Sequence, residues 1–371
     1  MAPALSLSRR LRSTPFTQRV TKAGVKAYTI YNHMLLATVF HTLEEDYWHL
    51  CENVQIWDVS AERQVEIEGP DAYKLIQLMT PRDLSKAQLG QCFYLPLCDT
   101  DGTLINDPIA IKYDHNKWWL SIASSDVILW AKGLATGYGF DVKINEPDVW
   151  PLAIQGPKAE ELCARVFGDS VKDSRFFRST ILNFNGKELL VARSGWSKQG
   201  GFEVYVNDAT LGLELWDTLF AKGADLNVRA GCPNNIERIE SGLMSFGNDM
   251  DYEDTPFECG LEKYVSLESD IESLSIEALR KHIPKQKLLG LVFDQAASDI
   301  TVLQDNQVIG EIRSQTWSPK YKAQLGFAML ELDSIKNRKN VIVMTDKGPI
   351  SARLATLPFD FDDLGMIAHT K

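Results

Sequence analysis

Apolar and polar residues alternate along several short stretches in the first half of the chain. A glycine-containing turn at residues 99–102 predicts a hairpin, because Gly102 can supply the positive φ that a tight connection needs. The alternation and the helical period predict strands at residues 64–68, 107–113 and 118–123 and a helix at residues 71–79. This mixture favours an α+β fold.

A second stretch repeats the same style. Gly156 and Pro157 separate a predicted strand from a predicted amphipathic helix. Asn185-Gly186 predicts another hairpin, because this dipeptide suits a two-residue turn. The elements expected here are strands at residues 152–155, 181–184, 187–192 and 202–206 and helices at residues 158–167 and 211–222.

The pattern changes near residue 285 to short strands separated by turns, which predicts a small β-barrel or sandwich. These strands are expected at residues 288–293, 301–303, 308–313, 325–329 and 341–344. Residues 267–285 have a helical, linker-like pattern. We therefore expect three domains, residues 1–150, 151–284 and 285–371, of which the first two could interleave along the chain.

Charge and composition narrow the class of protein. The 371 residues carry a formal net charge of −11, which argues against nucleic-acid binding. The first acidic residue is Glu44, and the basic segment before it is also typical of a mitochondrial transit peptide, so that alternative stays open here. No apolar run approaches the roughly 20 residues of a membrane span, so we expect a soluble cytoplasmic protein.

Several common chemistries lack their motifs. The sequence has no glycine-rich dinucleotide loop, no phosphate-binding Gly-Lys-Ser/Thr loop, no His-Glu-x-x-His and no Gly-x-Ser-x-Gly. The six cysteines and six histidines show no metal-ligand spacing. We therefore expect no metal site and reduced, buried thiols.

Three other segments are candidates for chemistry. Asp107 begins an apolar strand, where it is either a turn residue or a hydrogen-bond partner for an amine or a heterocycle edge. Residues 193–205 form a glycine-rich loop that is either a long hairpin or a ligand-binding loop. Residues 232–249 have helical spacing, and we interpret Arg238 and Glu240 as an internal ion pair or helix network.

Together these segments resemble the folate-binding aminomethyltransferase, or glycine cleavage T-protein, family. The resemblance rests on Arg-x-Gly-aromatic-x4-Gly-Phe-Glu at residues 193–203, Arg-x-Glu-x-Gly-Leu-x3-Gly-Asn-Asp at residues 238–249, and Thr-Pro-Phe-Glu at residues 255–258. Shorter matches lie at residues 11–16, 57–60, 154–157 and 313–319. The first of these places the basic N-terminus within the fold.

The resemblance implies a cloverleaf-like arrangement of two α+β domains and a C-terminal β-barrel, with tetrahydrofolate in a central channel. Asp107 matches the essential aspartate of the family, and Glu203 matches the glutamate that binds the pterin. Tyr94 falls where the family places an aromatic residue near folate. The implied cofactor is tetrahydrofolate acting as a cosubstrate.

Departures from the family pattern indicate a changed substrate. Trp196, Ser197 and Lys198 stand where aminomethyltransferases usually have Tyr-Thr-Gly, and Asn234-Asn235 stands where they have Arg-Asp. Residues 195–201, 6–16 and 31–36 instead look like the branch of the family that demethylates dimethylsulfoniopropionate. A sulfonium methyl group is already activated, so the enzyme would mainly align the reactants and exclude water.

On that interpretation, Trp196 faces the sulfonium cation, an attraction of about 0.5 to 2 kcal/mol, and Lys198 holds the substrate carboxylate. Tyr205 and Tyr31 would line the pocket, while Asp107 and Glu203 orient the pterin. The expected partners are tetrahydrofolate and the small sulfonium substrate, and a homodimer is compatible with the sequence. The alternatives are a true aminomethyltransferase with a lipoylated carrier, and a non-catalytic folate-binding protein whose Lys-Gly-Cys-x-x-Gly-Gln-Glu signature is missing here.

Overall fold

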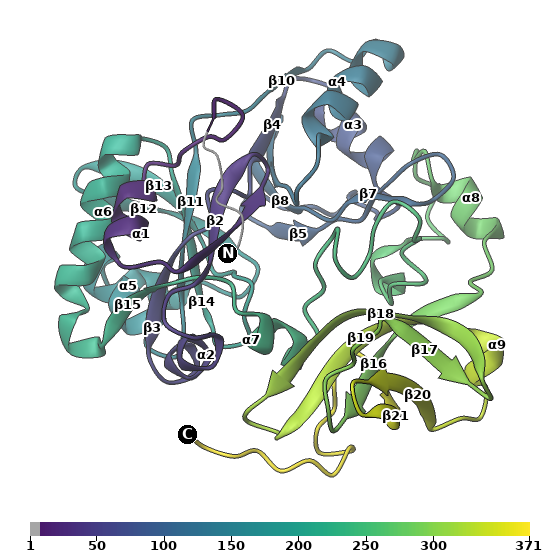
Figure 1. Cartoon of the computed structure of the whole chain (residues 1–371). Helices are drawn as coiled ribbons and strands as arrows, with labels where there is room; N and C mark the ends of the chain where they lie inside the picture. The colour runs from purple at the N-terminus through teal and green to yellow at the C-terminus, as the bar shows by residue number, and fades with distance from the viewer. Residues whose placement is uncertain (1–7) are drawn as a thin grey trace.

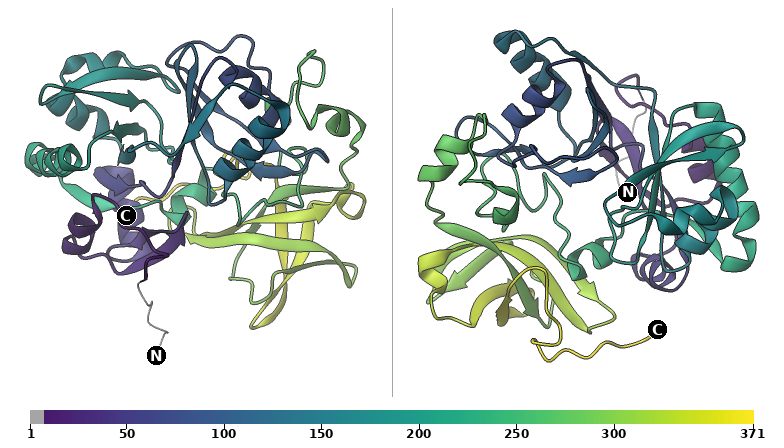
Figure 2. Two further views of the ribbon diagram at one scale, coloured as in Figure 1. Left: turned by 90° about the horizontal axis from the view of Figure 1, so that it is seen from above. Right: turned by 180° about the vertical axis from the view of Figure 1, so that it is seen from behind.

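The computed structural model describes residues 8–371, so Ser6 and Leu7 of the N-terminal motif lie outside the described residues. The chain forms three units around a common centre: two α/β units and a barrel (Figure 1). The same three units are distinct from above and from behind (Figure 2). Within the described part of the chain, no helix is both long and apolar enough to cross a membrane.

The first unit is a five-stranded antiparallel sheet covered by two helices. In sheet order its strands are β10 (Lys143–Asn145), β4 (Gln64–Glu68), β9 (Lys117–Ser121), β8 (Ile109–Asp114) and β5 (Cys92–Tyr94). The helices α3 (Ala72–Met79) and α4 (Val127–Tyr138) bury Leu75, Ile76 and Val127 against Trp118 of the sheet. Each helix therefore places one apolar face on the sheet, as the period of α3 predicted.

The second unit is a six-stranded sheet with helices packed on it. In sheet order its strands are β12 (Ser179–Phe184), β13 (Lys187–Ala192), β14 (Gly201–Val206), β11 (Trp150–Gln155), β3 (Val54–Asp58) and β15 (Val228–Gly231). The helices that contribute to its core are α1 (Thr17–Lys22), α5 (Ala159–Phe167) and α6 (Ala209–Lys222). The predicted hairpin turn is present, with positive φ at both Asn185 and Gly186.

The two sheets interleave along the chain. Strand β3 belongs to the first 60 residues, yet it pairs with β11 and β15 in the second sheet. Phe16 and Val20 likewise lie in the core of the second unit. Residues 1–150 therefore contribute both to the first sheet and to the sheet formed mainly by residues 150–231.

The third unit is a closed barrel, which confirms the predicted C-terminal barrel. Its strands are, in barrel order, β16 (Gln286–Phe293), β19 (Ala323–Glu331), β18 (Gln307–Ser318), β17 (Thr301–Gln304), β20 (Asn340–Thr345) and β21 (Gly348–Ala355). Strand β21 was not predicted, and β18 continues past its predicted end at residue 313. A bulge between Ile312 and Ser314 interrupts the alternation in β18, which explains the early predicted end.

The helical prediction for residues 267–285 is wrong for most of that segment. Only α8 (Ile276–Lys281) is helical. The preceding residues are held by long-range backbone hydrogen bonds, from Ser266 to Pro81 and from Leu274 to Leu78, both 2.9 Å. These partners lie about 190 positions away along the chain, so a local pattern could not indicate them.

Further short elements connect the units. Ile239, Leu104 and Phe327 share a core that joins all three parts of the chain. The connecting elements are β1 (Ala27–Tyr31), β2 (Met34–Val39), α2 (Leu43–Glu52), β6 (Leu97–Cys98), β7 (Leu104–Asn106) and α7 (Asn235–Glu240), while α9 (Leu332–Ile335) lies within the barrel unit between β19 and β20. In Figure 1, α7 lies between the second sheet and the barrel. The centre of the molecule is therefore built by all three units.

Candidate active site

Asp107 lies between β7 and β8, next to a residue that fixes its backbone. The neighbouring Asn106 is fully buried, and its side chain bonds both the N–H (3.0 Å) and the carbonyl (3.1 Å) of Ala123. Asp107 itself is half-buried, and its Oδ2 accepts a hydrogen bond from the Tyr94 hydroxyl at 3.0 Å. The carboxylate therefore points to another side chain and does not cap the turn.

The surroundings of Asp107 favour its protonated form. Burial raises the pKa of Asp107 from 3.8 to about 7, and the negative charge of Asp249 adds to the rise. The hydrogen bond from Tyr94 opposes that rise without cancelling it. A carboxyl group with this pKa can both hold and release a proton near neutral pH.

Glu203 lies on β14 in the interior of the six-stranded sheet and is 7% exposed. Ser194 donates a hydrogen bond to its Oε2, while its Oε1 takes part in no hydrogen bond within residues 8–371. Burial raises the pKa of Glu203, and the bond from Ser194 partly offsets the rise. The second carboxylate oxygen of this largely buried residue thus has an unused acceptor position.

A third acidic residue, Glu62, interacts through its charge with both of these carboxylates, and no motif in the sequence pointed to it. It lies between β3 and β4, just before Gln64, whose side chain bonds Ser121 at 2.8 Å. Burial and the charges of Glu203 and Asp107 raise the pKa of Glu62 well above its usual value. We call Glu62, Asp107 and Glu203 the carboxylate cluster. The only signal in the sequence was an acidic residue two positions after the Trp57–Ser60 motif.

Three tyrosines predicted to line the site lie around this cluster. Tyr94 bonds Asp107 and packs against the ring of Tyr264, with ring centroids 4.8 Å apart. Burial is the main cause of the raised pKa of Tyr31, and the negative charges of Glu62 and Asp107 add to it. Tyr31 and Tyr94 are therefore neighbours of the carboxylates.

Tyr205 differs from the other two because it is only 2% exposed. Its hydroxyl lies 3.3 Å from Ser121 Oγ, and its ring packs 6.0 Å from that of Trp119. It shares a small core with residues from both sheets, including Cys92 and Leu190. The structure thus places Tyr205 in the seam between the sheets, behind Glu203.

Trp196 and Lys198 lie on the loop between β13 and β14, which we call the tryptophan loop (residues 194–200). Ser197 Oγ donates to Gln155 Oε1 at 2.8 Å, which ties the loop to the end of β11. A Cβ at Gly195 would fall 2.1 Å from Gln155 Nε2, and its φ is +148°, so this position requires glycine. Trp196 is half-buried and Lys198 is exposed.

The guanidinium of Arg238 lies 5.8 Å from the centre of the Trp196 ring. Arg238 pairs with the fully buried Asp249 at 2.7 Å and donates to Ser314 of the barrel at 2.9 Å. Since the charge of Asp249 acts on Asp107, these contacts connect the tryptophan loop to the carboxylate cluster.

Arg238 and Glu240 belong to internal networks, as the sequence predicted, but they do not pair with each other. Arg238 forms a buried ion pair with Asp249 and also donates to Asn235 of its own helix at 2.8 Å. Glu240 accepts hydrogen bonds from Tyr47 (2.7 Å) and Ser318 (2.5 Å), which lie far away in the chain. Asn234, one of the departures from the family pattern, caps α7 by accepting from the N–H groups of Ile236 and Glu237.

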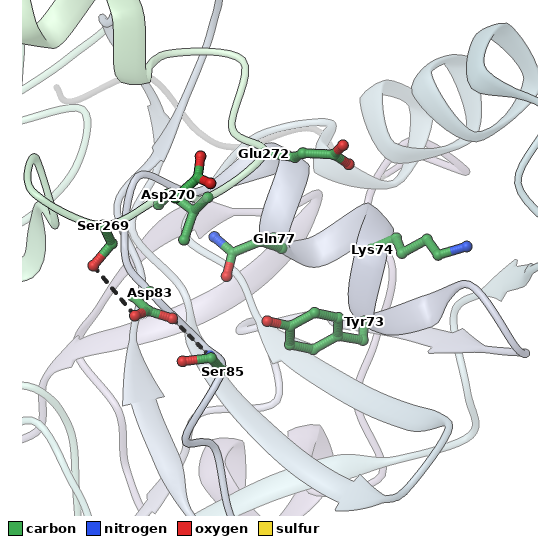
Figure 3. Close-up of a pocket in the computed structure, with 9 residues that line it drawn as sticks. Tyr73, Lys74, Gln77, Asp83, Ser85, Ser269, Asp270 and Glu272 are labelled. Carbon is green, nitrogen blue, oxygen red and sulfur yellow. Dashed lines mark hydrogen bonds between the residues drawn. The ribbon is translucent and has the colours of Figure 1, made fainter.

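A separate cleft of about 380 Å³ lies between α3 and residues 269–272 (Figure 3). Asp83 in this cleft is already engaged, because it accepts from the Ser85 N–H at 2.8 Å and from Ser269 at 3.3 Å. The lining of the cleft includes none of the predicted site residues. No group of three or more potential metal ligands occurs in the described residues 8–371.

The fold agrees with what the comparisons with known proteins found. The GCVT N-terminal domain model matches residues 16–269, and the glycine cleavage T-protein C-terminal barrel domain model matches residues 286–360. The chain therefore belongs to the glycine cleavage T-protein family, and the predicted family and α+β-plus-barrel fold are confirmed.

Individual relatives define its position more closely. The chain is 50% identical over 329 residues to dimethylsulfoniopropionate demethylase DmdA of Ruegeria pomeroyi, covering 87% of this chain and 90% of that protein. It is 30% identical to an aminomethyltransferase of Clostridium botulinum, covering 80% of this chain and 83% of the relative. The crystal structure of aminomethyltransferase T from Bartonella henselae matches its fold with a TM-score of 0.84 at 20% identity, covering 94% and 98% of the two chains.

Proposed function

We propose that this protein is a tetrahydrofolate-dependent demethylase that transfers a methyl group from the sulfonium of dimethylsulfoniopropionate to folate N5. The products are 5-methyltetrahydrofolate and 3-methylmercaptopropionate. The observation that carries the proposal is that Asp249, whose charge raises the pKa of Asp107, is bound by Arg238, the residue that lies over the Trp196 ring. The 50% identity with the Ruegeria pomeroyi demethylase supports it.

The carboxylate cluster is the proposed site for the pterin. A pterin ring presents N–H groups at its edge, and the unused Oε1 of Glu203 is an acceptor for such a group. Asp107 and Tyr94 form the adjacent hydrogen-bonded pair, and the Tyr94 ring offers an aromatic face. These residues therefore suit the cosubstrate, which when bound supplies the nucleophilic nitrogen N5.

The tryptophan loop is the proposed site for the methyl donor. One side of the Trp196 ring is taken by Arg238, so we place the sulfonium against its other face. Lys198 is exposed and holds the carboxylate of the substrate as a point charge. Tyr31 lies beside the carboxylates and forms part of the pocket wall, while Tyr205 supports that wall from behind.

The reaction must release one proton. The methyl–sulfur bond breaks with its electron pair left on sulfur, the new carbon–nitrogen bond forms, and the proton of N5 leaves. Asp107 is the proposed acceptor, because a pKa of about 7 allows it to be ionised before the step and protonated after it. Its charge would also stabilise the positive charge that develops on nitrogen during the transfer.

We further propose that the protein acts in the cytoplasm. Arg12 pairs with Glu146 at 2.6 Å and its N–H bonds the carbonyl of His33, so the basic N-terminal segment is part of the folded protein from Arg12 onwards. Fractionation of the native host would test this location. The compatible homodimer stays a prediction, which light scattering of the purified protein would test.

The proposed reaction can be tested directly. Purified protein is incubated without oxygen with tetrahydrofolate and dimethylsulfoniopropionate, and both products are measured by mass spectrometry. We expect them to form in a ratio of one to one. Omission of either substrate is the control. Binding of folate without turnover would exclude this methyl donor and leave an aminomethyl donor or a non-catalytic folate-binding role.

A further inference from the structure

Glu237 is a buried glutamate on α7 that directly contacts the tryptophan loop. Only 2% of the residue is exposed. Its Oε1 accepts hydrogen bonds from the Lys198 N–H at 2.8 Å, from Ser241 Oγ at 2.8 Å and from Gln199 Nε2 at 3.4 Å. A single carboxylate oxygen therefore holds the main chain at residue 198 and the side chain that follows it.

The second oxygen of Glu237 has no such partner. Oε2 is buried and makes no hydrogen bond within the described residues 8–371. An unsatisfied buried carboxylate oxygen is costly, so the group is retained at the expense of stability. Burial raises the pKa of Glu237, while its hydrogen bonds and the charge of Lys198 oppose that rise. A cost of this kind is typical of groups that serve a function.

The loop needs an external support because its own backbone is permissive. Three glycines with positive φ, Gly195, Gly200 and Gly201, surround the two substrate-binding candidates. Glycine has the largest freedom to lose on ordering, so the native loop conformation depends on contacts with neighbouring elements. Gln155 and Gly156 at the end of β11 hold Ser194, Ser197 and Gly200, and Glu237 on α7 holds residue 198.

Helix α7 itself is well placed to give that support. Asn234 caps its first turn. Arg238, the residue directly after Glu237 in the helix, lies over the Trp196 ring. Successive residues of one helix thus contact the loop at two points: the ring at residue 196 and the backbone at residue 198. The relative placement of Trp196 and Lys198 is set by this pair of contacts.

We infer that Glu237 is a positioning residue for the methyl donor, which fixes the tryptophan loop so that Trp196 and Lys198 act on the same molecule. This inference rests on the proposed function, since it assigns the loop to the sulfonium substrate. Glu237 touches neither reactant and lies outside the Arg-x-Glu-x-Gly motif formed by Arg238, Glu240 and Gly242.

The test compares Glu237→Ala with Glu240→Ala, which removes the same buried side chain one turn further along α7. Glu240 bonds Tyr47 and Ser318 and no residue of the loop, so it is a matched control. We expect Glu237→Ala to raise KM for dimethylsulfoniopropionate about tenfold, the order expected for losing a hydrogen bond to a charged group, with kcat changed less than threefold. KM for tetrahydrofolate should stay within twofold.

Two further variants separate positioning from folding. Glu237→Gln retains an oxygen that can accept from the Lys198 N–H, so it should restore KM to within threefold of the unchanged protein. Glu237→Asp keeps the charge but is one carbon shorter, so it should raise KM as the alanine variant does. If Glu237→Ala does not fold, the aspartate variant carries the comparison. Equal KM values for Glu237→Asp and the unchanged protein would overturn the inference.

A second readout does not need the proposed reaction. Trypsin cleaves after exposed lysines, and Lys198 lies in the loop that Glu237 holds. Cleavage at Lys198, followed by mass spectrometry without ligands, should be several-fold faster in Glu237→Ala and Glu237→Asp than in Glu240→Ala or Glu237→Gln. If the unchanged protein shows no demethylation, the proposed function fails and this readout alone decides the role of Glu237. Equal cleavage rates in all variants would refute that role.

Discussion

The carboxylate cluster and the tryptophan loop lie in the same centre but are held in different ways. Glu203 projects from the interior of a six-stranded sheet, and Asp107 follows a residue whose side chain is locked to Ala123. The tryptophan loop depends on side-chain contacts from Gln155 and Glu237. The proposed folate side of the site is therefore built into the sheets, whereas the proposed donor side is fixed by a few hydrogen bonds.

This difference suggests how one fold serves more than one methyl or aminomethyl donor. Changes in the sheets would disturb the packing of two cores, because the neighbours of Glu203 and Asp107 are buried. Changes in a loop and in the helix face behind it affect far fewer contacts. We expect the folate side to tolerate little change and the donor side to set the specificity.

The largest expected effect comes from the cluster. Asp107→Asn keeps the shape and an oxygen for the Tyr94 hydroxyl but cannot accept the released proton. We expect kcat to fall about a hundredfold or more, the range found for loss of a positioned proton acceptor, with folate affinity changed only a few-fold. Steady-state kinetics with both substrates would measure this.

Asp99→Asn is the matched control for that variant. Asp99 lies in the preceding hairpin, where its carboxylate bonds only the turn residues Asp101 and Thr103. Its kcat should equal that of the unchanged protein. A loss of kcat of threefold or less in Asp107→Asn would contradict the assigned role. The carboxylate cluster would then contribute to binding alone, as the tryptophan loop does.

A smaller effect is expected on the donor side. Trp196→Ala should lower kcat/KM for dimethylsulfoniopropionate about 2- to 30-fold, which corresponds to a cation–π attraction of about 0.5 to 2 kcal/mol. Trp196→Phe should recover part of this loss. Trp317→Ala, at an exposed position in the barrel, is the control. An equal loss of folate affinity would show that the two regions are not separable.

The smallest effect is a pH-dependent difference in stability. The folded protein holds a proton on Asp107 up to about pH 7, whereas the unfolded chain loses it near pH 4. The stability contributed by that proton is complete below pH 4 and is lost as pH rises through 7. The Asp107→Asn variant has no such carboxyl group and does not lose this stability as pH rises. The Tm of the variant minus the Tm of the unchanged protein should therefore be a few degrees larger at pH 8 than at pH 5.

Scanning calorimetry at both pH values would measure this difference, with Asp99→Asn as the reference. A difference in Tm that does not depend on pH would mean that Asp107 is ionised throughout. A different group would then have to accept the proton. Glu62 is a candidate, because its pKa is also raised.

Much of the fold was readable from local pattern. The Asn185-Gly186 hairpin and α3 follow from periodicity and turn chemistry over fewer than twenty residues. For the C-terminal unit the pattern left a barrel or a sandwich open, and the family resemblance indicated the barrel. Spaced motifs also indicated the family and brought Asp107, Glu203 and Tyr94 into one hypothesis. In the structure Tyr94 bonds Asp107, and the charges of Asp107 and Glu203 both act on Glu62, although the individual roles stay predictions.

What failed depended on partners far away in the chain. Residues 267–285 were predicted to be helical, but only α8 is, because nothing local indicates the backbone bonds of Ser266 and Leu274 to residues 81 and 78. Arg238 and Glu240 have the spacing of a helical network, but each found a partner more than ten positions away.

The sequence by itself determined the α+β class, the barrel, the glycine-rich loop and the family, because these depend on local periodicity and on the order of motifs. Only the tertiary structure decided that Glu62 joins Asp107 and Glu203, that β3 crosses into the second sheet, and that Glu237 supports the tryptophan loop. The physical reason is that charge interactions and hydrogen bonds act over a few ångströms in space, and those distances are set by sheet pairing between segments that the sequence keeps far apart.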